Sequence, residues 1–279
     1  MTLIQGILRP EHIWICTDNR VAVKNKFKND DHVKYVGIRC SDGTALLSYT
    51  GIAELRDGTK MSDWVRTVIR GENRDVESTV LVISDRANKE FCTYSPLPVL
   101  VFVIAAFVNS KAILYQIANI GGKNSWNKPL NHFSISKVPI DKPLYYAAGT
   151  GSSYITEGEK ERLEKIAAKN PRSSKDFLNL LIKVNKQVAE KDKERVSPSC
   201  IAVEMPEKGE PVTIVGNGSQ HISSGDIPFV LFGLDTTEMM QSALSLLPGG
   251  KNHNLPQEEI NKILDQIATK AVTPRKINM

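Results

Sequence analysis

The stretch Thr2–Arg20, TLIQGILRPEHIWICTDNR, decides the fold of this chain. Its runs Thr2–Leu8 and His12–Thr17 are rich in β-branched and aromatic residues, which favour strands. A short segment with proline at its centre separates the two runs and is typical of a turn. The pattern predicts an antiparallel β-hairpin in which residues whose numbers sum to about 20 face each other. That register places Thr2 opposite Asp18 at the open end of the hairpin.

A second hairpin is predicted further along the chain. The runs Lys34–Arg39 and Ala45–Tyr49 flank Asp42-Gly43, which is a strong turn signal. Paired residues here have numbers that sum to about 84, so Lys34 faces Thr50. The two hairpins therefore place a hydroxyl, a carboxylate and an amine at strand ends, where a reactive site can form.

The remaining elements complete an α+β pattern. Apolar periodicity and capping residues predict two pairs of helices, near 60–70 and 75–91 and after Thr156 and Ser173. Further strands are predicted at Val99–Val108, Ala112–Ile120, His132–Val138, Leu144–Ala148, Cys200–Met205 and Val212–Val215. Hairpins indicate antiparallel sheets, and each helix pair can cover one sheet face. We therefore expect a four-layer αββα sandwich of two stacked antiparallel sheets between helical layers.

The domain organisation follows from a change in composition near residue 246. Residues 1–245 carry the hairpins and helix pairs, and we expect them to form a single domain. The segment LPGGKNHNLPQEE begins at Leu246 and is typical of a linker. A short amphipathic helix is predicted after it, so residues 246–279 form an extension to the domain.

Composition excludes several classes of function. The net charge of +5 is scattered over 279 residues, so we expect no nucleic-acid partner. The longest apolar run, Val99–Val108, is roughly half the length of a membrane span, and no signal peptide is expected, so we predict a cytoplasmic protein without a membrane partner. Four cysteines without a CxxC pair indicate reduced thiols. Five histidines lack ligand spacing, which predicts no metal site.

Two glycine-containing segments resemble phosphate-binding loops only in part. Gly149–Tyr154 lacks the third glycine of a dinucleotide loop, and no parallel βαβ pattern surrounds it. Gly121-Gly122-Lys123 lacks the rest of a P-loop. We therefore expect no nucleotide and no other cofactor.

Thr2 has the chemistry of a self-contained nucleophile and base. Threonine at position 2 permits removal of Met1, which leaves a hydroxyl and an α-amino group on one residue. That amine has an ordinary pKa of about 8. A neighbouring Lys34 ammonium would lower the pKa of the amine and keep more of it neutral near pH 7. A buried Lys34 itself needs an opposite charge, which Asp18 supplies.

These residues resemble the opening of active proteasome β subunits and their bacterial relatives, a group of N-terminal-nucleophile hydrolases. Those chains begin on a threonine nucleophile and then carry an Asp-x-Arg segment and a lysine, matched in spacing by Asp18-Asn19-Arg20 and Lys34. SYTGIAEL at 48–55 resembles the family's glycine-containing loop, and Gly149-Thr150-Gly151 its Gly-Ser-Gly segment. The family's late Asp-x-x-Ser is best matched by Glu194-Arg195-Val196-Ser197. The resemblance covers roughly residues 2–216.

The resemblance implies a role for each matching residue. Thr2 would be nucleophile and base, Lys34 would tune its amine, and Asp18 would hold Lys34. Backbone N–H groups near Thr50 or Gly51 would form the oxyanion hole. Three further side chains would orient the terminal amine, namely Thr150, Glu194 and Ser197.

The sequence also departs from the family pattern. Ser48-Tyr49-Thr50 replaces smaller residues before the first helix, Thr150 replaces a serine, and Glu194 replaces an aspartate. In the family pattern, the specificity pocket would be lined from Val21 and from the strand that holds His32 and Lys34. Such a lining favours neither acidic nor basic substrate side chains.

The resemblance implies a threonine-type peptide hydrolase that acts within a homo-oligomeric assembly, expected to be stacked rings. Peptide bonds in a polypeptide substrate would be cleaved through an acyl-enzyme on Thr2. Two alternatives stay open: a non-catalytic ring-forming scaffold or binding chamber of the same fold, and an amidohydrolase that acts on small amides. No motif identifies an ATPase partner.

Overall fold

A computed structural model describes residues 2–23, 26–29, 32–121, 129–169, 171, 173–208, 212–216, 228–237 and 239. The predicted extension at 246–279 lies outside the described residues, and so does the end of the predicted 1–245 domain. Within the described residues no helix is both long and apolar enough to span a bilayer.

The first sheet is antiparallel and contains the N-terminal hairpin. Its strand order is β10 (Leu144–Ala148), β1 (Ile4–Leu8), β2 (His12–Asp18), β11 (Cys200–Pro206) and β12 (Val212–Gly216). The hairpin β1–β2 lies in the middle of this sheet, with β10 and β11 on either side of it. The predicted N-terminal hairpin is confirmed as a central element of the sheet.

The second sheet is built around the second predicted hairpin. Its order is β14 (Leu234–Asp235), β13 (Phe229–Leu231), β5 (Tyr35–Arg39), β6 (Gly43–Thr50), β7 (Val101–Val108), β8 (Lys111–Ile120) and β9 (Pro129–Pro139). A separate small sheet pairs β3 (Val21–Val23) with β4 (Lys26–Asn29). The two predicted hairpins thus lie in different sheets, β1–β2 in the first and β5–β6 in the second.

One strand corrects the expectation of two purely antiparallel sheets. Strand β13 pairs parallel with β5, so the second sheet is mixed. The Phe229 ring packs directly on Gly37, where a Cβ atom would lie 2.1 Å from the ring. A strand of only three residues carries too little periodicity to be recognised in the sequence, and its pairing depends on this tertiary contact.

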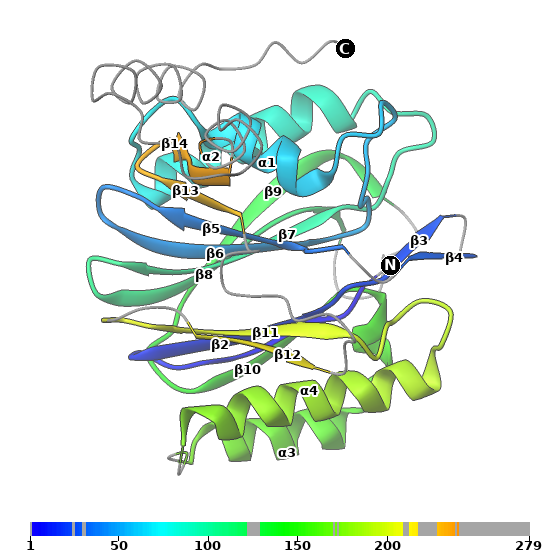
Figure 1. Ribbon diagram of the computed structural model, residues 1–279, viewed down its shortest axis with the longest axis vertical. Helices are drawn as coiled ribbons and strands as arrows, with labels where there is room; N and C mark the ends of the chain where they lie inside the picture. Colours follow the sequence, from blue (N-terminus) through cyan, green and yellow to red (C-terminus); the bar gives the residue numbers. More distant parts are fainter. Residues whose placement is uncertain are drawn as a thin grey trace, which may run out of the picture.

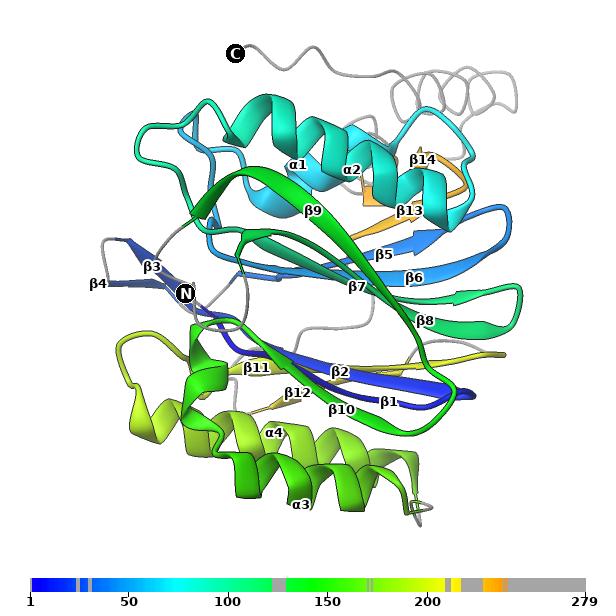
Figure 2. The same ribbon diagram turned by 180° about the vertical axis from the view of Figure 1, so that it is seen from behind.

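The helices cover the outer faces of the sheets. Figures 1 and 2 show α1 (Met61–Ile69) and α2 (Val76–Phe91) on the second sheet, and α3 (Glu157–Ala167) and α4 (Ser174–Lys191) on the first. A short 3-10 turn, η1 (Thr150–Tyr154), connects β10 to α3. The capping box predicted at Thr156 is present, and Ser173, at the predicted start of α4, forms a second one. The mixed α+β sandwich with helix pairs on both sides is confirmed at this level.

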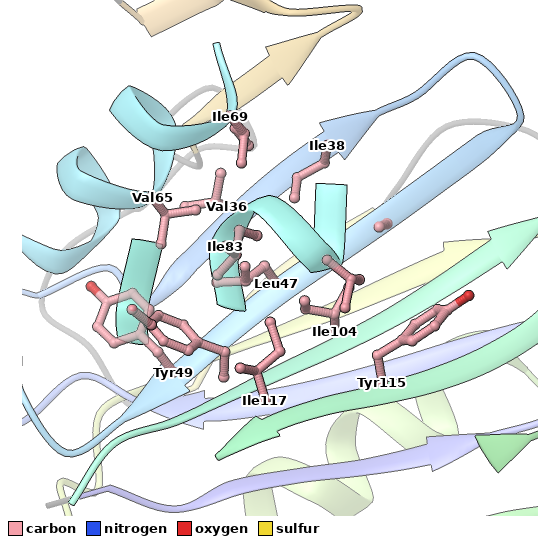
Figure 3. Packing of buried hydrophobic residues seen from close by; sticks show 14 of the residues in the cluster. Val36, Ile38, Leu47, Tyr49, Val65, Ile69, Ile83, Ile104, Tyr115 and Ile117 are labelled. Atoms are coloured by element: carbon pink, nitrogen blue, oxygen red, sulfur yellow. The ribbon is translucent and has the colours of Figure 1, made fainter. Parts of the chain in front are cut away.

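Three apolar clusters lie between adjacent layers and pack them together. Figure 3 shows the cluster between the second sheet and its helices, where Val65 of α1 and Ile83 of α2 meet Leu47 of β6. A second cluster fills the space between the sheets, and a third joins the first sheet to α3 and α4. Strand β7 supplies Ile104 to the first cluster and Val103 to the second. Its continuous apolar run is explained by burial on both faces.

A buried ion pair fixes the β13–β14 hairpin to α1. Arg66 Nη1 donates to both carboxylate oxygens of Asp235 at 2.6 Å, and Asp235 is 2% exposed. We expect Asp235→Ala to lower the free energy of unfolding by about 2–3 kcal/mol, because the buried Arg66 charge then keeps only its partly exposed partner Asp63, at 2.7 Å. Urea denaturation followed by circular dichroism measures this.

The matched control for that variant is an ion pair on the surface. Lys137 Nζ lies 2.7 Å from Glu77 Oε2, and both side chains are largely exposed. Glu77→Ala should change the free energy of unfolding by about 0–1 kcal/mol. An equal effect of the two variants would contradict the assignment of Arg66–Asp235 as a structural anchor.

Candidate functional site

The N-terminal hairpin brings Asp18 against the backbone beside Thr2. The observed register pairs Ile4 with Thr17, one residue away from the predicted pairing. Asp18 therefore faces Leu3, whose backbone N–H donates to Asp18 Oδ2 at 2.7 Å. The backbone N–H of Asp18 in turn donates to the Leu3 carbonyl at 3.3 Å. Thr2 directly precedes this paired segment in the chain.

The second hairpin delivers Lys34 to the same place from the other sheet. Strand β5 begins at Tyr35, which pairs with Ser48, again one residue from the predicted register. Lys34 lies just before this strand, and its Nζ donates to Thr2 Oγ1 at 2.6 Å. The same Nζ lies 3.4 Å from Asp18 Oδ1. The structure thus brings together the three residues whose spacing the sequence singled out.

The cluster of Thr2, Asp18 and Lys34 is buried, with exposures of 2%, 0% and 2%. Two more backbone N–H groups hold Asp18 Oδ1, that of Arg20 at 2.9 Å and that of Ser197 at 3.4 Å. Asp18 therefore accepts hydrogen bonds from several donors besides Lys34, which offsets part of the cost of burying its charge. The predicted position of Ser197 next to this cluster is observed.

Thr50 and Gly51 lie at the end of β6, on the rim of a pocket beside Thr2. Gly51 has a φ of +115°, and a Cβ atom there would lie 2.0 Å from the Val99 carbonyl oxygen, so only glycine fits. The pocket is lined by Thr2, Arg20, Val21, Lys34, Tyr49, Thr50, Gly51, Ile52 and Ala53. The predicted oxyanion segment and the predicted pocket residue Val21 thus line the same pocket as Thr2.

The segment around Thr150 contacts the backbone of Thr2. The Gly151 N–H donates to the Thr2 carbonyl at 3.3 Å. Gly149 has a φ of +89°, and a Cβ atom there would lie 2.0 Å from that carbonyl oxygen. Between these glycines, Thr150 Oγ1 is buried and has no hydrogen-bond partner within the described part of the chain. Buried hydroxyls normally have a partner, so this one is available for a group added or uncovered nearby.

Glu194 does not join the cluster. Its side chain is exposed, whereas the nearby Asp192 is buried with 7% exposure. The backbone N–H groups of Arg195 and Val196 hydrogen-bond to Asp192, at its side chain and at its carbonyl. The expected position of Glu194 in the cluster is therefore corrected: the residue is exposed, and Asp192 is the carboxylate that holds the turn of residues 192–196.

Arg20 holds the turn that carries Ser197, a role that the sequence pattern does not predict. Arg20 Nη1 donates to the Val196 carbonyl at 3.2 Å and also to the Lys193 carbonyl. Its own backbone N–H is held by Asp18. The Asp-x-Arg spacing is the sequence signal that could have indicated this role. Arg20 stands two residues after the buried Asp18 and connects Asp18 to the turn that carries Ser197.

His32 lies behind the pocket. Its Nε2 is 2.9 Å from the hydroxyl oxygen of Tyr49, which lines the pocket. Burial, followed by the charges of Lys34 and Lys60, lowers the pKa of His32 from 6.5 to about 4. Two carboxylates oppose this shift without reversing it, those of Glu54 and Asp63. His32 is therefore neutral at pH 7 and adds no charge beside Lys34.

This depressed pKa predicts that stability depends on pH. The contribution of neutral His32 is fully present above pH 6.5 and is lost as the pH falls toward 4, because the unfolded state then binds the proton more tightly. The wild type should lose up to about 3 kcal/mol of its free energy of unfolding through His32 between pH 6.5 and 4, and His32→Gln should lack this part of the loss. Urea denaturation at each pH tests this, with the exposed His132→Gln as control. Identical pH profiles for wild type and His32→Gln would contradict it.

The comparisons with known proteins leave the family open. Neither a scan against protein-family models nor a search of curated proteins found a match to this chain. Among the described residues, no three His, Cys, Asp or Glu side chains form a group that could hold a metal ion. The chemistry of the site is therefore inferred from its own geometry.

Proposed function

We propose that this protein is an N-terminal threonine hydrolase that cleaves peptide bonds. The observation that carries the proposal is the 2.6 Å hydrogen bond from buried Lys34 Nζ to Thr2 Oγ1, next to buried Asp18. A buried ion pair is a weak source of stability compared with apolar residues of similar size. Its position against a hydroxyl nucleophile favours a chemical role.

The proposed reaction begins once Met1 has been removed from Thr2. The neutral α-amine takes the Oγ1 proton as Oγ1 attacks the peptide carbonyl carbon. The Gly51 N–H stabilises the resulting oxyanion, and Lys34 stabilises charge on Oγ1. The protonated amine then gives its proton to the leaving nitrogen as the C–N bond breaks. Water then attacks the ester carbonyl carbon as the α-amine takes a proton from it. The bond to Oγ1 breaks, which releases the carboxylic acid product and restores the Thr2 hydroxyl.

Thr150 is proposed to orient the liberated amine. Its unpartnered hydroxyl is flanked by the two glycines that contact the Thr2 backbone. Removal of Met1 converts the Thr2 amide into an amine with new hydrogen-bonding capacity. A buried hydroxyl within this segment gains a partner by accepting or donating there. Ser197 is proposed to act with it from the side of Asp18.

The proposed function includes a proposed fold, that of the N-terminal-nucleophile hydrolases. The layered arrangement of the helix pairs and sheets supports the αββα fold of the N-terminal-nucleophile hydrolases, and the resemblance to proteasome β subunits supports it from the sequence (Figure 1). Besides the uncharged Val21, Tyr49 and Ala53, the pocket is lined by the cations Arg20 and Lys34, so its lining selects no single class of substrate side chain. The proposed substrate is a polypeptide, as the resemblance to proteasome β subunits implies.

Confinement in a ring of identical subunits is part of the proposal, because a bare threonine nucleophile cuts most accessible chains. Contacts between subunits of the ring would cover apolar side chains that are exposed in the single chain, which include Leu81, Ile135, Val138, Leu231 and Phe232. Light scattering on the purified protein gives the assembly mass. A monomer or dimer that cleaves only small amides would favour the amidohydrolase alternative.

The test is turnover by protein whose first residue is Thr2. Release from a cleavable N-terminal fusion produces this form, and the same chain with Met1 retained serves as control. We expect the first form to hydrolyse fluorogenic peptides and unfolded casein, and the second to be inactive because its amine is blocked. Hydrolysis of neither substrate by a correctly folded, oligomeric Thr2 form would refute the proposal and favour the scaffold alternative.

A further inference from the structure

A buried asparagine outside the pocket holds the loop on which Gly51 rests. Asn119 lies in β8 at the point where the β8–β9 register shifts, between Ala118 and Ile120. Its side chain is 1% exposed. Irregularities of this kind redirect a side chain out of the regular alternation of a strand.

The Asn119 side chain fixes the backbone that leads into β7. Its Oδ1 accepts from the Leu100 N–H at 2.9 Å, and its Nδ2 donates to the Pro98 carbonyl at 2.7 Å. Nδ2 also lies 3.4 Å from the Leu130 carbonyl, and the Asn119 backbone N–H donates to the Leu100 carbonyl at 3.4 Å. One amide group thus holds both sides of Val99.

Val99 is the residue against which Gly51 packs. A Cβ atom on Gly51 would lie 2.0 Å from the Val99 carbonyl oxygen and 3.0 Å from Leu100 Cα. The adjacent pair of the ladder is Thr50 with Val101. The position of the Gly51 peptide is therefore set by the backbone of residues 99–101, and that backbone is set by Asn119.

From this geometry we propose that Asn119 is a positioning residue for the oxyanion hole, acting through Val99 on the Gly51 N–H. The inference rests on the proposed function, because it needs an oxyanion to form at Gly51. Displacement of a donor by a fraction of an ångström weakens stabilisation of the tetrahedral intermediate. The hydroxyl of Thr2 and its contacts with Lys34 lie on other elements and stay in place.

The experiment compares two electrophiles on the Thr2 form. A β-lactone acylates Thr2 through a tetrahedral oxyanion, whereas a peptide vinyl sulfone alkylates Oγ1 by conjugate addition without one. We expect Asn119→Ala to slow β-lactone acylation by about 10- to 100-fold and alkylation by less than about 3-fold. Asn119→Asp keeps the acceptor for Leu100 but places an oxygen in place of the donor to the Pro98 carbonyl, and should show the same selective effect.

Asn88→Ala is the matched control. Asn88 Oδ1 accepts from the Phe133 N–H at 2.7 Å, and its Nδ2 donates to the Ser84 carbonyl at 3.0 Å, so it makes the same kind of contacts away from Gly51. It should slow neither electrophile. Equal slowing of both electrophiles by the Asn119 variants, or no slowing, would overturn the inference while leaving Thr2 as the nucleophile. No labelling of wild-type Thr2 by either electrophile would refute the proposed function itself.

Discussion

Thr2→Ala is expected to lower peptide hydrolysis by roughly 10³-fold or more, to the level of the uncatalysed reaction plus binding effects. The variant removes the only atom that is proposed to bond to the substrate carbonyl. It also removes the acceptor of the 2.6 Å hydrogen bond from Lys34 Nζ. The measurement is kcat/KM with a fluorogenic peptide, on protein that begins at residue 2.

Two further variants sharpen this expectation. Thr2→Ser keeps a hydroxyl and an α-amine and should retain measurable turnover. Thr79→Ala removes the same atoms from a buried threonine in α2, whose hydroxyl donates to the Asp75 carbonyl, and should leave kcat/KM within a few-fold of wild type. Undiminished hydrolysis by Thr2→Ala would place the nucleophile elsewhere or assign the activity to a contaminant.

Lys34→Met is expected to lower kcat/KM by roughly 10²- to 10³-fold. Methionine fills a similar volume but supplies no charge to Thr2 Oγ1 or to Asp18. Lys34→Arg should not restore activity, because a planar guanidinium does not reproduce a compact ammonium that contacts both groups. The exposed Lys60→Met at the start of α1 is the control, and it should have little effect.

A double-mutant cycle tests whether Lys34 and Asp18 act as a unit. Asp18→Asn should also lower kcat/KM, because the ammonium then loses its carboxylate partner at 3.4 Å. If the two residues work together, the double variant should be little worse than Lys34→Met alone. Additive losses would indicate independent roles and contradict the proposed arrangement.

The positions of Thr2, Asp18 and Lys34 could be predicted because they depend on local signals. Each hairpin has clear strand composition and a turn whose length fixes the register to within one residue. The predicted register placed Lys34 opposite Thr50. The observed register pairs Tyr35 with Ser48, so its extension by one residue places Lys34 opposite Tyr49. Strand ends are close enough together that this error did not separate the three side chains.

Other features could not be predicted because they depend on tertiary contacts. The parallel strand β13 is short and is held by the Phe229 contact and the buried Asp235. Glu194 and Asp192 are both acidic residues in one turn, and only burial distinguishes them. The role proposed for Asn119 depends on a register shift in β8–β9 that no local pattern reports. Such contacts join segments that are far apart in the chain.

The most direct test of Thr2 as nucleophile is mass mapping after treatment with a β-lactone. Protein that begins at Thr2 is labelled, digested and analysed before and after hydroxylamine, which cleaves esters but leaves amides intact. We predict one adduct, on the peptide that starts at Thr2, lost on hydroxylamine treatment and absent from Thr2→Ala. A hydroxylamine-stable adduct on Lys34, an adduct on another residue, or no adduct on the folded protein would contradict the account.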